Sequence, residues 1–276
     1  MRARNGGGEE GGRRQPPALL AADLDGTLLF PDRSFDPSLP DVLARLRARG
    51  VAVVPCTGRM LRSARPVAAR LGLREGPVVC YQGALVAELG DGAWLRHQPV
   101  PSPLAVRVVE DVRRLGLHLN AYVDDELVVE RLDEWARRYA EYAEVGITAV
   151  DDLAALVRER PPTKFVVLAP AAEVPAVVAG LRRRWGGRLT VNRSQPEYVE
   201  VTAAGVSKSA ALAWLCRRLG VPQEAVVACG DGMNDIDLLR WAGLGVAVAE
   251  ADADVRAAAD VVVPRAGLAR FLDGLA

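Results

Sequence analysis

The sequence is poor in the residue types on which several common kinds of functional site depend. It holds two histidines, His97 and His118, and neither lies near another candidate ligand. This scarcity argues against a histidine-based metal site and against a hydrolase built on a serine, histidine and aspartate triad. A bound metal ion should therefore be held by oxygen atoms, which indicates a hard ion.

Cysteine is also scarce, and the four in the chain are Cys56, Cys80, Cys216 and Cys229. Their spacing matches no zinc pattern, and three of them end short apolar runs. We expect buried free thiols rather than disulfides, as is usual in a reducing compartment.

An excess of one charge and long apolar runs are missing as well. The 276 residues include 35 basic and 35 acidic side chains, so the net charge at pH 7 is zero. This balance argues against a nucleic-acid partner, and no apolar run approaches the roughly 18 residues of a membrane span. Residues 1–16 are rich in glycine and arginine, lack the apolar segment of a signal peptide, and are predicted to be a disordered tail. We expect a cytoplasmic protein that is a monomer or a homodimer.

The order of the apolar runs predicts an α/β protein with two parts. Over residues 17–83 and again over 192–276, short β-rich runs alternate with helical patterns, which indicates a three-layer core with a parallel sheet. Residues 84–191 read as an inserted α+β domain with paired strands, one pair joined by a hairpin turn at Asp124-Asp125. Ligands of such parallel sheets bind beyond the carboxyl ends of the strands.

The most informative segment is Asp23-Leu24-Asp25-Gly26-Thr27, which follows the apolar run of residues 18–22. Two crowded carboxylates repel each other, so the pattern suggests a cation, a shared proton or a reaction that needs both acids. A solvated turn is the simpler interpretation of this segment taken alone.

Two further segments offer groups that bind anions. Thr57-Gly58 follows the predicted strand 51–54, where a hydroxyl and main-chain N–H groups can meet a phosphate. Lys208 is one of only two lysines among the 35 basic residues, and it stands at a predicted helix start, a poor place for a cation. The position therefore favours the compact charge of an ammonium over a planar guanidinium, although chance is an alternative explanation for a lysine here.

A second acidic turn is Gly230-Asp231-Gly232-Met233-Asn234-Asp235, directly after the predicted strand 225–229. An ordinary helix cap could explain Asn234 and Asp235. Two acidic turns after two buried strands of one sheet instead predict a carboxylate pocket for Mg²⁺.

Phosphoryl transfer unites these segments. We expect Asp23 to attack phosphorus and form an aspartyl-phosphate, while Asp25 protonates the leaving group and then activates water. The predicted metal residues are Asp23, Asp25 through its main-chain carbonyl, Asp231 and Asp235. The predicted phosphate-binding residues are Thr57, Gly58, Lys208 and Asn234.

The four segments, in this order, resemble the four motifs of the haloacid dehalogenase superfamily. Tyr81-Gln82-Gly83-Ala84, Tyr198-Val199-Glu200-Val201 and Gly205-Val206-Ser207-Lys208 resemble its Cof-type branch. That branch usually has asparagine where this chain has Gln82, and glycine where it has Ser209. The resemblance implies a Rossmann-like core, a class IIB cap over residues 84–191, Mg²⁺ as the cofactor, and the roles given above for Asp23 and Asp25.

Substrate specificity should then depend on the inserted part of the chain. Plausible substrate contacts are Arg59, Lys164, Asn192, Arg193 and Ser194, although an ordinary surface or hinge role is an alternative for each. We predict a Mg²⁺-dependent phosphatase of a small phosphorylated metabolite, with sugar phosphates as the leading class. The alternatives are a phosphomutase, a phospho-accepting signalling domain and a non-catalytic sensor of phosphorylated metabolites.

Overall fold

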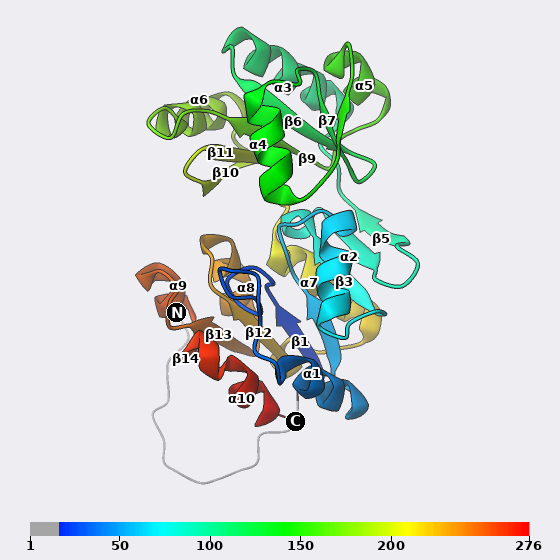
Figure 1. The fold of residues 1–276 in the computed structure, drawn as a ribbon, viewed down its shortest axis with the longest axis vertical. Helices are drawn as coiled ribbons and strands as arrows, with labels where there is room; N and C mark the ends of the chain where they lie inside the picture. Colours follow the sequence, from blue (N-terminus) through cyan, green and yellow to red (C-terminus); the bar gives the residue numbers. More distant parts are fainter. Residues whose placement is uncertain (1–16, 276) are drawn as a thin grey trace.

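Three β-sheets organise residues 17–275, the part of the chain that the computed structural model describes. Figure 1 shows them in two stacked bodies. We call residues 102–203 the upper body, and residues 17–97 with 204–275 the lower body. The predicted tail, residues 1–16, lies outside the described residues.

The lower body is built on five parallel strands in the order β14-β13-β12-β1-β2. Strands β1 and β12 at its centre are apolar and buried along their whole length, as expected for a sheet covered on both faces. The strands are β1 (Leu19–Ala22), β2 (Ala52–Pro55), β12 (Val226–Gly230), β13 (Leu244–Val248) and β14 (Val261–Val263). The helices around them are α1 (Leu39–Ala48), α2 (Leu61–Arg70), α7 (Lys208–Leu219), α8 (Ile236–Trp241), α9 (Ala253–Ala258) and α10 (Leu268–Asp273).

A small antiparallel sheet of β3 (Pro77–Cys80), β4 (Leu85–Glu88) and β5 (Trp94–His97) extends the lower body beside β2. A bridge between Cys56 and Val79 joins it to the chain that leaves β2. The single turn η1 (Tyr81–Gly83) connects β3 to β4 and packs on the start of α7.

The upper body is a six-stranded sheet in the order β10-β11-β9-β6-β7-β8, in which only the β7–β8 pair is parallel. Its strands are β6 (His118–Val123), β7 (Glu126–Val129), β8 (Ile147–Ala149), β9 (Lys164–Leu168), β10 (Leu189–Gln195) and β11 (Tyr198–Ala203). Helices α3 (Ser102–Arg114), α5 (Leu153–Glu159) and α6 (Val174–Trp185) share one apolar core with one face of this sheet. Helix α4 (Glu134–Ala143) packs on the opposite face, whose apolar side chains join the core of the lower body.

The predicted α/β architecture, with a parallel-sheet core and further sheets in an inserted part, is confirmed. The domain limits at residues 83/84 and 191/192 stay a prediction. In the structure, β4 and β5 pair with β3 of the lower body, and β11 continues the upper sheet as far as Ala203. Hydrophobic periodicity finds such strands but does not say with which sheet they pair.

The four cysteines are free and buried, as predicted. Burial raises the pKa of the Cys229 thiol to about 12, which keeps it protonated. Within residues 17–275, no helix is both long and apolar enough to cross a bilayer.

Gly83 supplies a test of how η1 packs on α7. Its φ is +103°, and a Cβ there would lie 2.1 Å from the carbonyl oxygen of Ser207. We expect Gly83→Ala to lower the free energy of unfolding by about 3 kcal/mol, from backbone strain plus overpacking. Gly116→Ala is the matched control, because Gly116 has a φ of +67° with open space around it, and strain alone should cost about 1 kcal/mol. Equal losses in urea titrations of the two variants would contradict this packing.

Candidate functional site

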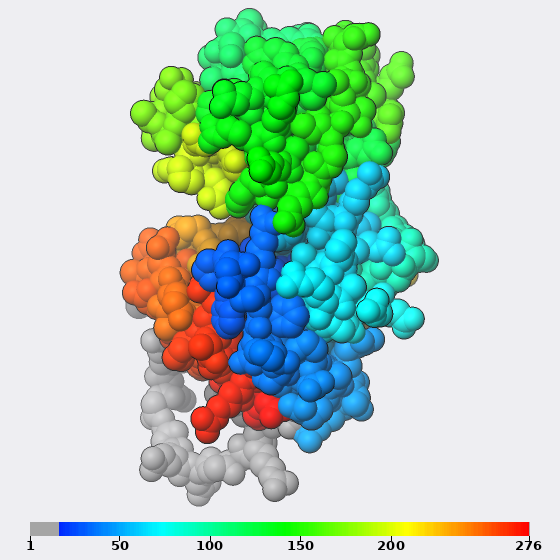
Figure 2. All heavy atoms as spheres, viewed as in Figure 1, coloured from blue at the N-terminus to red at the C-terminus, as the bar shows by residue number. Residues whose placement is uncertain are grey.

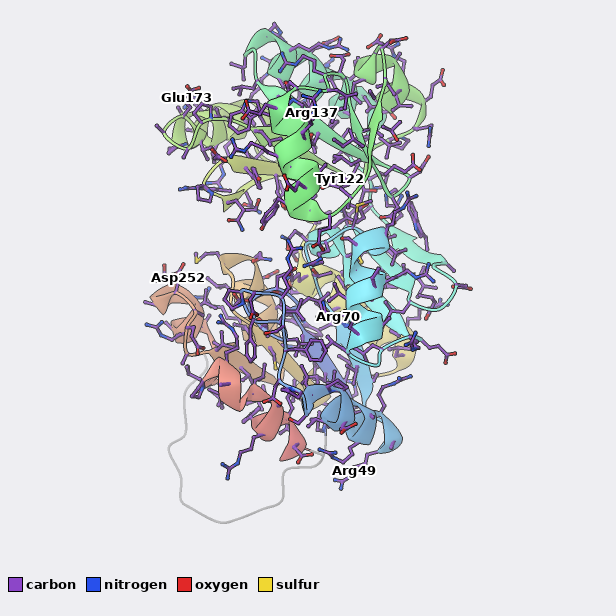
Figure 3. All side chains as sticks on the ribbon, viewed as in Figure 1. Arg49, Arg70, Tyr122, Arg137, Glu173 and Asp252 are labelled. Carbon is purple, nitrogen blue, oxygen red and sulfur yellow. The ribbon has the colours of Figure 1, made fainter. Side chains whose placement is uncertain are left out.

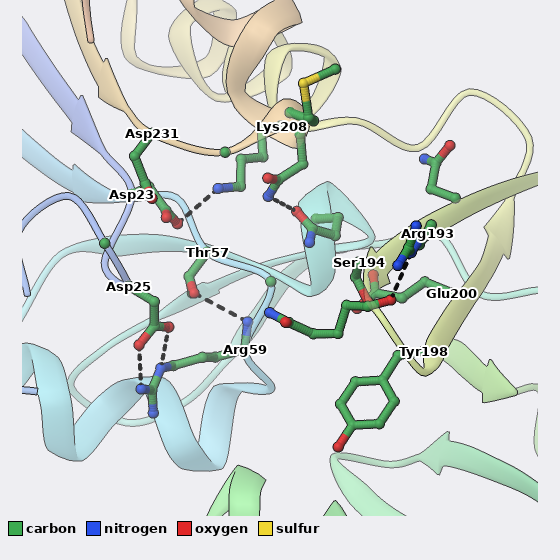
Figure 4. Close-up of a pocket in the computed structure, with 18 of the residues that line it drawn as sticks. Asp23, Asp25, Thr57, Arg59, Arg193, Ser194, Tyr198, Glu200, Lys208 and Asp231 are labelled. Atoms are coloured by element: carbon green, nitrogen blue, oxygen red, sulfur yellow. Dashed lines mark hydrogen bonds and ion pairs between the residues drawn. The ribbon is translucent and has the colours of Figure 1, made fainter. Parts of the chain in front are cut away.

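The loops that follow β1, β2 and β12, together with the start of α7, line one pocket of about 1060 Å³. The opposite wall of the pocket comes from the upper body. Figure 2 shows a hollow between the two bodies, bordered by the yellow and orange parts of the chain. The four segments singled out in the sequence therefore meet in space (Figure 4).

Lys208 lies at the centre of the site and is fully buried. Its Nζ donates hydrogen bonds to Asp23 Oδ1 at 2.8 Å and to Asp235 Oδ1 at 2.6 Å. Burial alone lowers the pKa of Lys208, but the charges of the two carboxylates and these bonds raise it above its usual value. The side chain is therefore an ammonium ion at any physiological pH.

The carboxylates of Asp23, Asp231 and Asp235 form an acidic cluster. Each contributes one oxygen to a group whose members all lie within 4.8 Å of one another. Burial raises the pKa of Asp23, and so do the charges of Asp235 and Asp231, whereas Lys208 opposes this rise. Burial also raises the pKa of Asp231, whose Oδ1 accepts a hydrogen bond of 2.7 Å from the Thr27 hydroxyl.

These carboxylates fit a hard divalent cation. Three acids face the single ammonium of Lys208, so negative charge is in excess where the three oxygens converge. Oxygen donors at such spacing suit Mg²⁺. Its charge would offset both the burial and the mutual repulsion that raise the pKa values of Asp23 and Asp231. The side chain of Asp25 lies outside this cluster.

Asp25 instead forms a bidentate ion pair with Arg59. The guanidinium donates from Nε to Oδ2 at 2.6 Å and from Nη2 to Oδ1 at 2.5 Å (Figure 4). Arg59 follows Thr57 and Gly58 after β2, and its main-chain N–H donates to the Thr57 hydroxyl at 3.1 Å. The predicted proton donor and a predicted substrate contact are thus bound to each other.

Gln82 is a pocket residue that the sequence analysis did not assign to the site. Its Oε1 accepts a hydrogen bond of 2.8 Å from Asn234 Nδ2, and its amide group covers Gly58 so closely that a Cβ at Gly58 would lie 2.6 Å from Nε2. Gln82 and Tyr81 both have positive φ, of 58° and 53°. This left-handed backbone turns Gln82 toward two loops, and nothing in the residue types signals it.

The remaining predicted substrate contacts lie on the upper-body side of the pocket. Lys164 is buried on β9, and its Nζ donates to Glu200 Oε1 at 3.2 Å and to the Gly58 carbonyl at 3.3 Å. Asn192, Arg193 and Ser194, on β10, also line the pocket, with Arg193 and Ser194 labelled in Figure 4.

All five tyrosines of the sequence form one chain of edge-to-face contacts across this region. The ring centroids of Tyr81, Tyr122, Tyr139, Tyr198 and Tyr142 lie, in that order, 5.5, 6.5, 5.1 and 5.9 Å apart. All but Tyr81 line the pocket, and Tyr122 lies beside α4 (Figure 3). This aromatic wall cannot be recognised from the sequence alone, because its members are scattered over more than 100 positions and only the fold assembles them.

Comparisons with known proteins found a matching family, relatives of similar length and solved structures of the same fold. A family model described as haloacid dehalogenase-like hydrolase matches residues 20–271. The chain is 30% identical over 262 residues to a pyridoxal phosphate phosphatase of Escherichia coli, a match that covers 89% of this chain and 92% of the relative. It is 29% identical over 270 residues to a 5-amino-6-(5-phospho-D-ribitylamino)uracil phosphatase of Bacillus subtilis, with 93% and 96% covered. A crystal structure from Thermotoga maritima is similar at a TM-score of 0.85 and 28% identity, with 94% and 97% covered.

The acidic cluster predicts a metal-dependent gain in stability. A cation that binds only the folded chain should raise its melting temperature, by the equivalent of about 2.7 kcal/mol when Mg²⁺ is present at 100 times its dissociation constant. We expect Asp231→Asn to abolish most of this shift, because it removes one of the three converging carboxylates. Asp254→Asn, an exposed position on α9, should keep the full shift. Equal shifts in thermal melts of the two variants would rule out Asp231 as a ligand.

Proposed function

The chain belongs to the haloacid dehalogenase-like hydrolases, and on this basis we propose that it hydrolyses phosphate monoesters of small metabolites through an aspartyl-phosphate on Asp23. The observation that carries the proposal is the buried ammonium of Lys208, bound to Asp23 and Asp235 beside Asp231. Such a site combines a carboxylate nucleophile with the positive charge that a phosphate dianion requires.

The two chemical steps use the two acids of the first segment. In the first step Asp23 attacks phosphorus, the bond from phosphorus to the ester oxygen breaks, and Asp25 donates its proton to the leaving alkoxide. In the second step Asp25 takes a proton from the water that attacks the phosphoaspartate, which releases phosphate and restores Asp23. Because Arg59 holds both oxygens of Asp25 in this structure, we infer that Asp25 releases Arg59 when it takes part in proton transfer.

The residues around Asp23 would bind the phosphoryl group. Lys208 would contribute its ammonium, Thr57 its hydroxyl, and Gly58 a main-chain N–H. Asn234, anchored to Gln82, would orient its amide toward the same region. Mg²⁺ held by Asp23, Asp231, the carbonyl of Asp25 and Asp235 would supply further positive charge against the repulsion between substrate and nucleophile.

The pocket supports a substrate larger than a bare phosphate. Its volume of about 1060 Å³ leaves room for the alcohol part of a phosphorylated metabolite. Asn192, Ser194 and Gln195 line it and can hydrogen-bond to hydroxyl groups, which favours sugar phosphates as the leading class. The aromatic wall also suits a planar ring, so a phosphorylated heterocycle is the second candidate.

Replacement of the proposed nucleophile is the direct test of the mechanism. We expect Asp23→Asn to lower kcat for p-nitrophenyl phosphate in the presence of Mg²⁺ by at least roughly 1,000-fold, because an amide cannot form the covalent intermediate. Asp254→Asn should retain wild-type turnover, since its side chain is exposed and outside the pocket. Turnover of Asp23→Asn within tenfold of the wild type would refute the assignment.

Product analysis separates a phosphatase from the alternatives. Across a panel of sugar phosphates and phosphorylated heterocycles, we expect free phosphate and free alcohol to appear in equal amounts, because water completes the second step. A phosphomutase would instead return an isomeric phosphate ester with little free phosphate. A signalling domain would keep a long-lived acyl phosphate, which acid-quenched samples would retain on Asp23.

A further inference from the structure

A tight turn of the upper body reaches the lower body beside the phosphate-binding segment. Asp124 and Asp125 form this turn between β6 and β7, with φ values of 48° and 60°, as in two-residue hairpins. Asp124 stays within the upper body, where its Oδ2 accepts a hydrogen bond of 2.7 Å from Arg160. Asp125 points the other way, into the lower body.

The Asp125 carboxylate accepts three hydrogen bonds from the lower body. Its Oδ1 accepts from the Leu61 N–H at 2.9 Å and from the Tyr81 hydroxyl at 2.7 Å, and its Oδ2 accepts from the Arg62 N–H at 2.7 Å. Burial raises the pKa of the Asp125 carboxyl, and these three bonds oppose that rise. The turn is therefore fixed by donors that lie more than 40 positions away in the sequence.

These contacts complete the start of helix α2. The first N–H groups of a helix have no partner within the helix and are usually satisfied by a side chain at the N-cap. The N-cap residue here is Met60, which makes no such hydrogen bond. A carboxylate from the upper body therefore caps a helix of the lower body.

The capped turn of α2 continues directly from the loop of residues 57–60. Tyr81 holds this loop from within the lower body, because its main-chain N–H donates to the Arg59 carbonyl at 2.9 Å while its hydroxyl donates to Asp125. Lys164 holds it from the upper body through the Gly58 carbonyl. The loop that carries Thr57 is thus fixed from both bodies at once.

We propose that Asp125 is a positioning residue for phosphate binding. It caps α2 from the upper body and thereby fixes the 57–60 loop when the two bodies are packed against each other. The inference rests on the proposed function, because it takes Thr57 and Gly58 as phosphate-binding residues. Asp125 itself is not among the residues that line the pocket, so it acts through the loop and not on the substrate.

The turn offers a matched pair of variants to test this role. Asp125→Asn keeps the size of the side chain and tolerates positive φ, but it places an NH₂ group where an acceptor is required. We expect it to weaken the binding of inorganic phosphate up to about tenfold, which equals ~1.4 kcal/mol and lies within the range found for a lost helix cap. KM for p-nitrophenyl phosphate should rise by a similar factor, with a smaller change in kcat. Asp124→Asn should leave both constants unchanged, because the Asp124 carboxylate hydrogen-bonds to Arg160 of the upper body and not to the start of α2.

Hydrogen exchange reports on the cap itself. The amides of Leu61 and Arg62 should exchange faster in Asp125→Asn than in Asp124→Asn, while exchange in β1 and β12 stays the same. Tyr81→Phe removes one of the three donors, so it should weaken phosphate binding in the same direction but less. Wild-type phosphate affinity and KM in Asp125→Asn would overturn the proposal, with or without faster exchange at α2.

Calorimetric titration measures the binding of inorganic phosphate without any turnover. The role of Asp125 can therefore be tested independently of the proposed hydrolase activity. A wild-type chain that binds phosphate but hydrolyses no ester in the panel would contradict the proposed function, and the comparison of the two turn variants would still decide the role of Asp125. A wild-type chain that binds no phosphate, with or without Mg²⁺, would overturn both.

Discussion

The ion pairs of Lys208 are the contacts on which the rest of the site depends. An ammonium buried without partners would lose its proton, and carboxylates buried close together would gain one. Here Lys208 bridges Asp23 and Asp235, so the ammonium and both carboxylates each have an opposite charge at hydrogen-bond distance, although negative charge stays in excess. Removal of one partner from such a buried pair typically costs about 3–5 kcal/mol, because the other charge is left uncompensated. The site is therefore also a structural element of the lower body.

The parallel sheet makes this concentration of charge possible. Strands β1 and β12 are hydrogen-bonded neighbours that run in the same direction, so their carboxyl ends open at one edge and deliver Asp23 and Asp231 side by side. Asp235 follows one turn later, where its Oδ2 accepts from the N–H groups of Asp231 and Gly232 at 3.1 and 3.0 Å. Burial of the apolar strands stabilises the lower body, and the loops at their carboxyl ends hold the polar groups of the site.

The same geometry explains which features could be predicted from sequence. The convergence of Asp23, Thr57 and Asp231 could be predicted, because in an α/β sheet residues at strand ends share one edge whatever the details of packing. Lys208 begins a helix instead, and its assignment to the site follows from the positive charge that phosphoryl transfer requires. Gln82 could not, since its approach to Gly58 and Asn234 depends on a left-handed backbone that its residue type does not favour. The aromatic wall and the contacts of Asp125 depend on how the upper body packs against the lower body, and local periodicity carries no information about that.

The pocket loops are held by hydrogen bonds within each loop and also by residues that tie the loops to one another. Gln82 joins the loop after β2 to the loop after β12, and Tyr81 joins the loop after β2 to the upper body. The first turn of helix α2 is capped by Asp125, so the segment that carries Thr57 is also tied to the upper body. The upper body therefore contributes to the site at two points, through the β10 side chains that line the pocket and through the β6–β7 turn that caps the helix after the 57–60 loop. Under the proposed function, the first would act on the substrate and the second on the loop that binds the phosphoryl group.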